Sequence, residues 1–558
     1  MKKYIIYIIL IVFGLTGTTG CDFIDITPEN ALTYENAFDT PQEMEAAVST
    51  LHSYIMAILS SSTSQEEIGM LYNGANKKEG VNLALINHDW LPQMGRAIHD
   101  WGGHYAIIGF ANIIESNIKK SYPEEMYNFL IGQAEFAKAY AYYDLARAYG
   151  WAVIVPDNDS ESPALPTSSP DEVLKKAEEY ALKAFNHCPK YEFLHHTDGV
   201  KITNKQYASK EICAALLAYI YAWHASVPEG VSKSERQDYY KESEKYASML
   251  IDGELKGYVS LEPTIRDLVE NTLNNRHTGK ESIFEVELDP KYIVSMPREP
   301  LYTAHYFFGW PYHSDIIDST RAPRNTVSCK RILNLYGGLE TNDHRLEYFF
   351  PETKRRYNSA FDKEAMKEDS LISTKKIPWG PPAWGMFQTI YIGGFPDIAP
   401  NRAFVKKFYK EFRYSNNPEN PKHFVNFDVN KVVWRLADLI LLRAEVRNFS
   451  GDKAGAVKDI NRIRERANAA LYPAPGEENG DLQFIIFQER ERELIYENHR
   501  WWDIRRNKDY YKKFLPAAYR KLTEADISLG ALYYPTPNRA GEYNVKLLPN
   551  KYWFSRMN

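Results

Sequence analysis

Small apolar residues recur at helical spacing in the first half of the chain. Residues 129–151 read FLIGQAEFAKAYAYYDLARAYGW, in which Ala134, Ala137 and Ala141 begin a stripe with steps of three and four. Such a stripe forms one face of a helix, and its alanines let a neighbouring helix approach closely. We expect Gly150 to end this helix in a left-handed conformation, before an extended stretch at 153–156.

Further segments show the same period. The pattern predicts helices over residues 169–188, 207–224 and 238–251, and a helix hairpin whose two apolar faces, 436–449 and 457–467, are separated by Gly451. This hairpin has a length of about 34 residues, the period of a tetratricopeptide unit. No clean consensus recurs at constant period, so we expect scattered tetratricopeptide-like pairs.

The pattern changes between residues 253 and 430. Residues 283–288 read IFEVEL and alternate like a strand, while Pro, Gly and aromatic residues crowd the rest. We therefore predict a mainly α protein, with tetratricopeptide-like helix hairpins as a frame and an irregular, loop-rich region with a few short strands. The expected divisions are a signal peptide (1–20), a tether (21–40), an N-terminal helical region (41–252), a loop-rich region (253–430) and a C-terminal region (431–558).

The first residues have the pattern of an export signal. Lys2 and Lys3 precede an apolar run over 4–15, and small residues lead to Cys21. The segment resembles a bacterial lipoprotein signal, although Thr18 stands where Leu is usual, so Cys21 is predicted to carry the lipid that anchors the mature chain. The alternative is simple secretion, in which Cys21 has no role.

Composition narrows the class of protein. The 558 residues are 44% hydrophobic with a formal net charge of −6, and no stretch is basic enough to follow a nucleic-acid backbone. No later apolar run approaches the roughly 20 residues of a membrane-spanning helix. Cys188, Cys213 and Cys329 lack CxxC spacing, so neither a disulfide framework nor a zinc site is indicated, and buried free thiols are expected.

Motifs of catalysis and metal binding are absent from the sequence. We find no nucleophile elbow, HExxH helix, phosphate loop or zinc spacing, so neither an enzyme nor a cofactor is expected. Asp157 opens a calcium-like run, but Ser162 and Ser168 replace its sixth-position Gly and twelfth-position Glu. A surface loop is the favoured interpretation there, and a polar loop is favoured for His195 and His196.

Eight motifs follow one another in a particular order. They are the leader, NAL and NAF at 30–32 and 36–38, GQAE at 132–135, ESIFEV at 281–286, DHR at 343–345, RLAD at 435–438, and ERERELIYENHRWWDIRR at 489–506. This ordered set resembles the RagB/SusD family of Bacteroidetes outer-membrane nutrient-binding lipoproteins, over essentially the whole chain. Asn498 stands where the family often has Gly, and residues 548–552 are a loose version of its usual ending.

The resemblance implies a function without turnover. Family members resemble a hinged lid on a SusC-like TonB-dependent transporter, lipid-anchored in the outer membrane and facing the cell exterior, where they capture oligosaccharides or peptides. The expected partners are that transporter, an oligosaccharide and the membrane. Two alternatives stay open: the same scaffold capturing peptides, and an exported glycan hydrolase.

Aromatic residues in loops are the candidate ligand platform, because flat rings stack on the apolar faces of sugars. The candidates are Trp90, Trp310, Tyr312, Trp379 and Trp384. For each tryptophan the alternative is a ring that fastens its own loop to the body. Trp101 and Tyr105 have helical spacing and are expected in the core.

The charged C-terminal motif favours a structural role. Glu489 and Arg492, Arg490 and Glu493, and Glu497 and Arg500 are each three residues apart. On a helix such residues are neighbours, so we expect them to pair with one another and not to do acid–base chemistry. Trp501 and Trp502 beside them are likewise expected to be structural.

The predicted lipid anchor at Cys21 can be tested by mutation. Cys21→Ala removes the thiol that would carry the lipid, so the protein should leave the membrane pellet for the supernatant on ultracentrifugation of cell envelopes. Cys329→Ala, which removes an internal thiol, is the matched control and should stay in the pellet. A Cys21→Ala protein that still sediments wholly with envelopes would contradict the anchor.

Overall fold

The computed structural model describes most of the chain as a set of packed helices with four small sheets. The described residues are 38–61, 100–157, 164–227, 231–275, 277–287, 327–354, 357, 373–378, 387–392, 402–403, 405–408, 412–413, 424–426, 430–507 and 517–557. The longer helices are α2 (Pro41–Ser61), α5 (Trp101–Asn117), α6 (Glu124–Ala148), α7 (Pro170–His187), α8 (Lys210–His224), α9 (Lys233–Ile251), α17 (Leu436–Ser450), α18 (Lys453–Arg466) and α19 (Leu482–Leu494).

Shorter elements connect them. The short helices are η3 (Tyr191–Phe193), α10 (Ile265–Asp267), η4 (Leu268–Leu273), α13 (Cys329–Tyr336), α14 (His344–Phe349), α20 (Arg500–Arg506), α22 (Ala517–Arg520), α23 (Glu524–Ser528), α24 (Asn538–Tyr543) and α25 (Lys551–Met557). The strands are β1 (Ser282–Val286), β2 (Val327–Ser328), β3 (Ser373–Pro378), β4 (Phe387–Ile392), β5 (Arg402–Ala403), β6 (Phe412–Arg413), β7 (Phe424–Asn426) and β8 (Lys431–Arg435). They pair antiparallel as β1–β8, β2–β5, β3–β4 and β6–β7.

The alanine-rich helix is the centre of the helical frame, as its pattern predicts. Ala134, Ala137 and Ala141 have no exposed surface, and α6 packs against α5 and α7. A Cβ atom on Gly132 would lie 2.6 Å from the Sγ of Cys188, at the end of α7, so this seam requires glycine. The side-chain amide of Gln133 accepts from the backbone N–H of Ala208 and donates to its carbonyl, at 2.8 and 2.9 Å.

Two predicted helix starts are corrected by their caps. The apolar pattern placed one start at residue 207, but Ser209 accepts from the N–H of Ile212 and α8 begins at Lys210. It placed another at residue 238, but Ser232 and Glu235 form a capping box and α9 begins at Lys233. The first turn of α9 is polar and exposed, which is why hydrophobic periodicity missed it.

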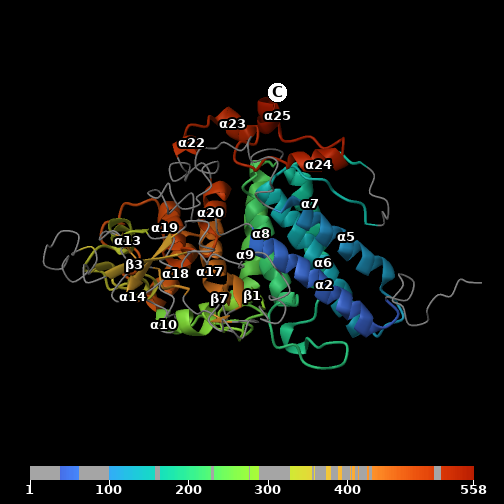
Figure 1. The fold of residues 1–558 in the computed structure, drawn as a ribbon, viewed down its shortest axis with the longest axis horizontal. Helices are drawn as coiled ribbons and strands as arrows, with labels where there is room; N and C mark the ends of the chain where they lie inside the picture. Colours follow the sequence, from blue (N-terminus) through green and yellow to red (C-terminus); the bar gives the residue numbers. More distant parts are fainter. Residues whose placement is uncertain are drawn as a thin grey trace, which may run out of the picture.

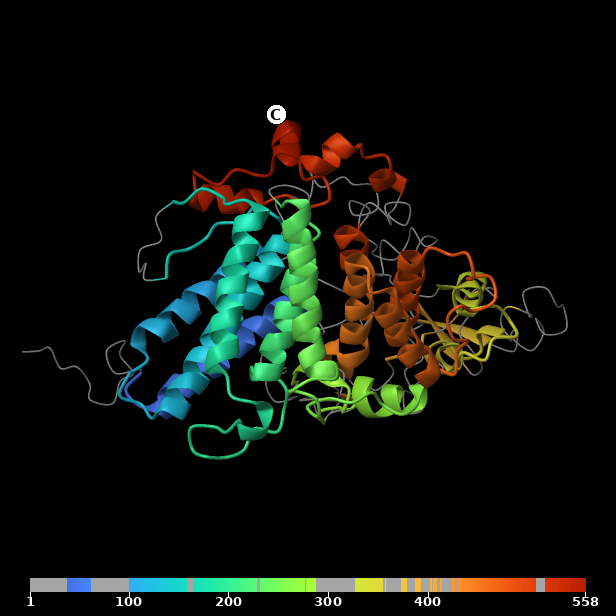
Figure 2. The same ribbon diagram turned by 180° about the vertical axis from the view of Figure 1, so that it is seen from behind.

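Successive helices pack side by side across the molecule. In Figures 1 and 2, α2 and α5–α9 form one half, and α17–α20 with α13, α14 and β3 form the other. The two halves meet where α9 packs against α17, and Gly451 closes α17 in the left-handed conformation, at φ +96°. The predicted hairpin α17–α18 and strand β1 are confirmed, as is the mainly helical fold. The five-part division of the chain stays a prediction.

The C-terminal segment, residues 517–557 with α22 to α25, crosses one end of both halves, at the top of Figure 1. The N–H of Tyr534 donates to the carbonyl of Ala148 at 2.9 Å, which attaches this segment to the end of α6. Gly150 has φ +72°, and a Cβ there would lie 2.9 Å from the ring of Tyr533. The predicted left-handed stop at Gly150 is therefore confirmed, and the tight contact also favours glycine.

Three cysteines and several rings are buried as expected. Cys188, Cys213 and Cys329 are buried and form no disulfide with one another, and burial beside Cys188 raises the pKa of the Cys213 thiol. Trp501 and Trp502 also belong to the core. Among the described helices, none is both long and apolar enough to cross a membrane.

A network of buried ion pairs joins the β1–β8 strand pair to α14, α18 and α19. Its members are Arg345, Arg435, Arg464 and Arg466 against Glu281, Glu489, Glu493 and Glu497. Arg435, at the end of β8, lies 2.7 Å from a carboxylate oxygen of each of Glu281, Glu493 and Glu497. The network therefore fastens β1 and β8 to α19 and the residues that follow it.

Most of the predicted i, i+3 pairs along this motif are wrong. Glu489 and Arg492 do pair, at 3.0 Å. Arg490 instead binds Asp438 and Asp503, at 2.7 and 2.8 Å. α19 ends at Leu494, so the chain turns away before a third pair can form.

The last predicted pair is also replaced by tertiary contacts. Glu497 pairs with Arg435 and Lys407, while Arg500 pairs with Glu491. Asn498 has φ +76°, a left-handed conformation that Gly adopts freely and Asn tolerates better than most residues. The structural role of the motif is confirmed, but its partners come from distant parts of the chain.

Removing one network cation should destabilise the fold strongly. Arg435→Met leaves Glu281, Glu493 and Glu497 buried without their shared partner, which should cost about 3 to 5 kcal/mol of unfolding free energy. The measurement is the midpoint of urea unfolding. Lys241→Met, which breaks the exposed pair with Asp238, is the control and should leave the midpoint unchanged. Equal midpoints for the two variants would contradict this role.

The network should also set the response to acid. Nearby arginines lower the pKa of Glu489 to about 2, against the burial that raises it, and Arg435 does the same for Glu497. Because the folded pKa values lie below the ordinary value of 4.5, the stability these groups contribute is complete above about pH 4.5 and is lost as the pH falls towards 2.

The acid response has a second, separable component. Burial lowers the pKa of His52 from 6.5 to about 4, so stability from its neutral form declines already from about pH 6.5 downward. Thermal unfolding midpoints from pH 7 to 2 should therefore fall gently first and more steeply below about pH 4.5. If the unfolding midpoint falls with a single slope from pH 7 to 2, and His52→Asn leaves that slope unchanged, the contribution of the carboxylates is contradicted.

Candidate ligand-binding site

The predicted platform itself falls outside the described residues. This applies to Trp90, Trp310, Tyr312, Trp379, Trp384 and the predicted lipid attachment residue, Cys21. What the structure does describe is the frame on either side of the segments that carry them. The ends of these segments decide which candidate residues can come together.

The segment 62–99, which carries Trp90, starts and ends at the same place. It follows Ser61 at the end of α2 and precedes Asp100, which caps α5 by accepting from the N–H of Gly103 at 2.9 Å. A Cβ on Gly103 would lie 2.7 Å from Ile58, so the first turn of α5 packs directly on the last turn of α2. Both ends of the segment therefore adjoin.

The segment 288–326, which carries Trp310 and Tyr312, leaves from the same point. It follows β1, whose last residue Val286 pairs with Lys431 at the start of β8. The Lys431 ammonium donates a hydrogen bond to the carbonyl of Leu59, in the last turn of α2. Burial lowers the pKa of Lys431 to about 8. The ends of α2 and β1 and the start of β8 thus form one junction, which we call the loop junction.

The loop junction is held rigidly on its β1 side. The N–H of Glu287 donates to the side-chain carbonyl of Gln206, at 2.9 Å. The buried ammonium of Lys205 donates to the carbonyls of Gly279 and Ser282, at 3.2 and 2.5 Å, and burial lowers its pKa to about 8. These contacts fix where the chain leaves β1.

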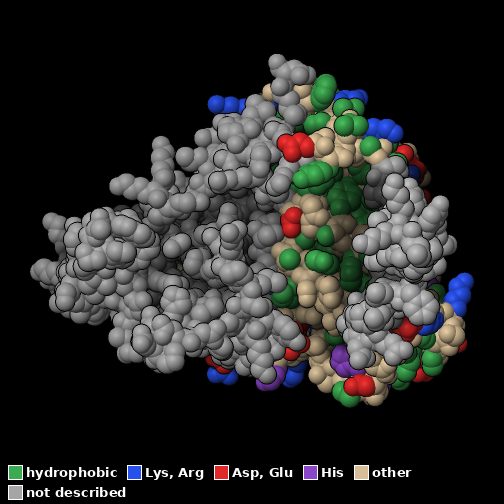
Figure 3. All heavy atoms as spheres, turned by 45° about the vertical axis from the view of Figure 1, so that its right-hand side comes forward, with side chains coloured by type: hydrophobic (Ala, Val, Ile, Leu, Met, Phe, Trp, Pro, Cys, Tyr) green, Lys and Arg blue, Asp and Glu red, His purple; other side chains and the backbone are tan. Residues whose placement is uncertain are grey.

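Helices α2 and α5 add apolar surface close to the junction. Tyr54 on α2 is 38% exposed and makes an edge contact with Phe110 on α5, with ring centroids 5.7 Å apart. Figure 3, which brings this side of the molecule forward, shows hydrophobic side chains in a vertical band with few charged groups among them. These aromatic residues were not predicted, because both have the spacing of ordinary helix residues.

Trp379 and Trp384 belong to a separate element. They fall between β3 and β4, which pair as a hairpin from Ser373 and Ile392 to Pro378 and Phe387. The structure therefore brings together the described residues that flank segment 62–99 and those that precede segment 288–326, while the positions of Trp90, Trp310, Tyr312, Trp379 and Trp384 remain predictions.

Groups that could suggest other chemistry are engaged in structural contacts. The carboxylate of Asp157 lies 3.7 Å from the Lys138 ammonium and 3.8 Å from that of Lys176, which disfavours a calcium ion there. His196 binds the carboxylate of Glu45, as expected of a polar loop. Within the described ranges, no cluster of three His, Cys, Asp or Glu side chains could hold a metal.

Trp101 and Tyr105 on α5, which the sequence predicts to be core residues, pack into the body of the protein. Trp101 is 7% exposed and lies 4.8 Å from the ring of Tyr149, edge to face, while Tyr105 is partly buried and accepts from the N–H of Val153 at 2.7 Å. These rings support the start of α5. Fold and site together define a helical scaffold protein with loops that leave from a shared junction.

Comparison with models of known protein families shows to which family this scaffold belongs. Residues 342–550 match the model described as the SusD family, and residues 22–221 match the model described as starch-binding associating with outer membrane. The two matches lie at opposite ends and together span most of the chain. The chain belongs to the SusD/RagB family.

Individual relatives agree over the full length. SusD-like protein P2 of Formosa agariphila is 25% identical over 577 aligned residues, which cover 99% of each chain. SusD-like protein P38 of the same organism is 22% identical and covers 91% of this chain and 93% of its own.

Solved structures show the same fold. A SusD homologue from Bacteroides thetaiotaomicron has a TM-score of 0.67 at 19% identity and covers 93% of this chain and 99% of its own. A laminarin-binding SusD-like protein has a TM-score of 0.62 at 16% identity and covers 91% and 98%. At these identities the likeness establishes the helical SusD-like fold.

Proposed function

We propose that the protein is a cell-surface lipoprotein that binds oligosaccharides and passes them to a SusC-like TonB-dependent transporter without hydrolysing them. The lipid on Cys21 would hold it in the outer membrane, facing the cell exterior. Three findings support the proposal: the family, its description as starch-binding and membrane-associated, and the laminarin-binding relative of the same fold.

The observation that carries the ligand site is the loop junction. Residues 62–99 are flanked, and residues 288–326 are preceded, by chain that meets where Lys431 binds Leu59, which supports our proposal that Trp90, Trp310 and Tyr312 contact one ligand. A sugar ring buries apolar area on each aromatic ring at roughly 25 cal/mol per Å², so two or three rings suffice for reversible capture. Weak binding suits a protein that must release its cargo.

The ring of Tyr54, which is 38% exposed, and the partly buried ring of Phe110 support the same location. They belong to α2 and α5, which bound the segment that carries Trp90. Trp379 and Trp384 remain proposed contributors through the β3–β4 hairpin. We place no role in hydrolysis on any of these residues, because they include no pair of carboxyl groups of the kind that glycoside hydrolysis ordinarily uses.

Two other functions can be separated from this one. A peptide-binding protein would enrich oligopeptides from a digest, detectable by mass spectrometry after purification. An exported hydrolase would release reducing sugar from the glycan that it binds. We expect neither result.

The aromatic platform can be tested by affinity electrophoresis in gels that contain laminarin, starch, cellulose derivatives or mannan. The wild-type protein should be retarded by at least one of them. The double variant Trp90→Ala and Trp310→Ala removes two stacking rings, worth about 2 kcal/mol together, so its binding should be about 30-fold weaker.

The control is Tyr543→Ala, which removes a 77% exposed ring from the C-terminal segment and should migrate like the wild type. Circular dichroism and thermal midpoints establish that each variant is folded. If the double variant and the wild type are retarded equally, these loops do not carry the ligand platform. No retardation of the wild type by any glycan would count against the whole proposal.

A further inference from the structure

The α17–α18 helix hairpin and the start of α19 surround a pocket of about 810 Å³. It is bounded by the end of α17, the first turns of α18, the residues before α19 and the start of α19. Its lining is Asn448, Phe449, Lys453, Ala454, Val457, Tyr472, Gly480, Asp481, Leu482 and Gln483. The volume falls within the range of small-molecule sites, about 300 to 1,000 Å³.

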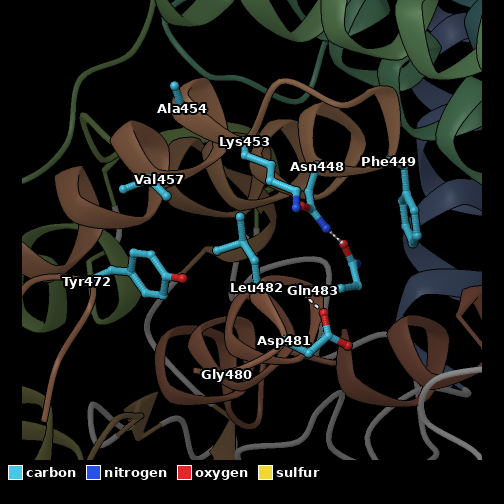
Figure 4. A pocket seen from close by; sticks show the side chains of 10 residues that line it. All are labelled: Asn448, Phe449, Lys453, Ala454, Val457, Tyr472, Gly480, Asp481, Leu482 and Gln483. Carbon is cyan, nitrogen blue, oxygen red and sulfur yellow. Dashed lines mark hydrogen bonds between the residues drawn. The ribbon is translucent and has the colours of Figure 1, made fainter. Parts of the chain in front are cut away.

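One side of the pocket is apolar. Figure 4 shows Tyr472 and Val457 on one side of Leu482. Leu482 belongs to a small hydrophobic cluster that is separate from the main core, and Val457 and Tyr472 pack against that cluster. The Tyr472 ring is half-buried, so it can offer apolar surface to a ligand.

The other side is polar and includes a second aromatic ring. Figure 4 shows Asn448, Gln483 and Phe449 there, with the Asn448 amide donating to the Gln483 side-chain carbonyl at 2.7 Å. Lys453 and Asp481 are exposed at this rim. They carry opposite charges, so the rim has no net charge to attract an anion or a cation.

The lining is held in place before any ligand arrives. The side-chain amide of Asn461 accepts from the N–H of Tyr472 at 2.7 Å. Phe449 stacks on Tyr240 of α9, with centroids 5.0 Å apart and planes 16° from parallel. Asp481 accepts from the N–H of Gln483 at 3.0 Å. A preorganised lining lowers the entropic cost of binding.

We infer that this pocket is a second binding site, for a short uncharged saccharide. An apolar ring on one side matches a sugar face, and amide, carboxylate and ammonium groups on the other match hydroxyl groups, which both donate and accept hydrogen bonds. The inference rests on the proposed function, because a capture protein that holds one glycan at two points gains from a high effective concentration.

The pocket is tested by methyl NMR of the full-length protein, with signals from Val457 and Leu482 as local reporters. The probes are maltose, cellobiose, laminaribiose and N,N′-diacetylchitobiose. At least one should shift both reporters saturably in the millimolar range. Ala454→Trp, which fills the pocket from an exposed position on α18, should abolish these shifts, and Lys453→Gln should weaken binding several-fold.

Ala46→Trp makes the same change at an exposed position on α2 and should leave the shifts as in the wild type. The Trp90→Ala and Trp310→Ala double variant should also retain them, because it alters only the loop platform. No shift with any disaccharide would overturn the inference, as would shifts with a neutral tripeptide alone. Glycan retardation in gels without reporter shifts would leave the proposed function standing and remove only this second site.

Discussion

The buried ion-pair network is the interaction on which the architecture depends. Arg435 is the last residue of β8 and binds Glu281, the residue before β1, and also Glu493 and Glu497 of the C-terminal motif. Charges this deep lose their hydration, so each must be compensated completely by its partners. The arrangement therefore tolerates one relative placement of these chain segments, and the strand pair that forms part of the loop junction is held in that placement.

A rigid frame of this kind suits a protein that binds through its loops. The frame fixes the points from which loops leave, while the loops are free to differ in length and composition. Lys431 and Leu59 join the ends of two such loops, although α2 and β8 are far apart in sequence. The fold is kept at low sequence identity, as solved structures at 19% and 16% identity show.

The candidate site was only partly accessible from sequence. Neighbouring Pro and Gly residues predict that Trp90 and Trp310 lie in loops, because backbone-breaking neighbours are a local signal, and this prediction falls outside the described residues. Tyr54 and Phe110 were missed, because exposure of a helix residue depends on which neighbours cover it. The pocket beside Leu482 was missed for the same reason, since its lining comes from three helices and the residues that link them.

The sequence by itself determined that helices α6 to α9 and the α17–α18 hairpin exist, their glycine stops and the family, although not every helix start, because helical periodicity and ordered motifs are local properties. It also indicated that the charged C-terminal motif is structural. Only the tertiary structure decided the partners of those charges. Arg490 binds Asp438 and Asp503, and Glu497 binds Arg435, since the helix ends at Leu494 and buried charges pair with whatever the fold brings to them. Long-range pairing of this kind leaves no periodic trace in the chain.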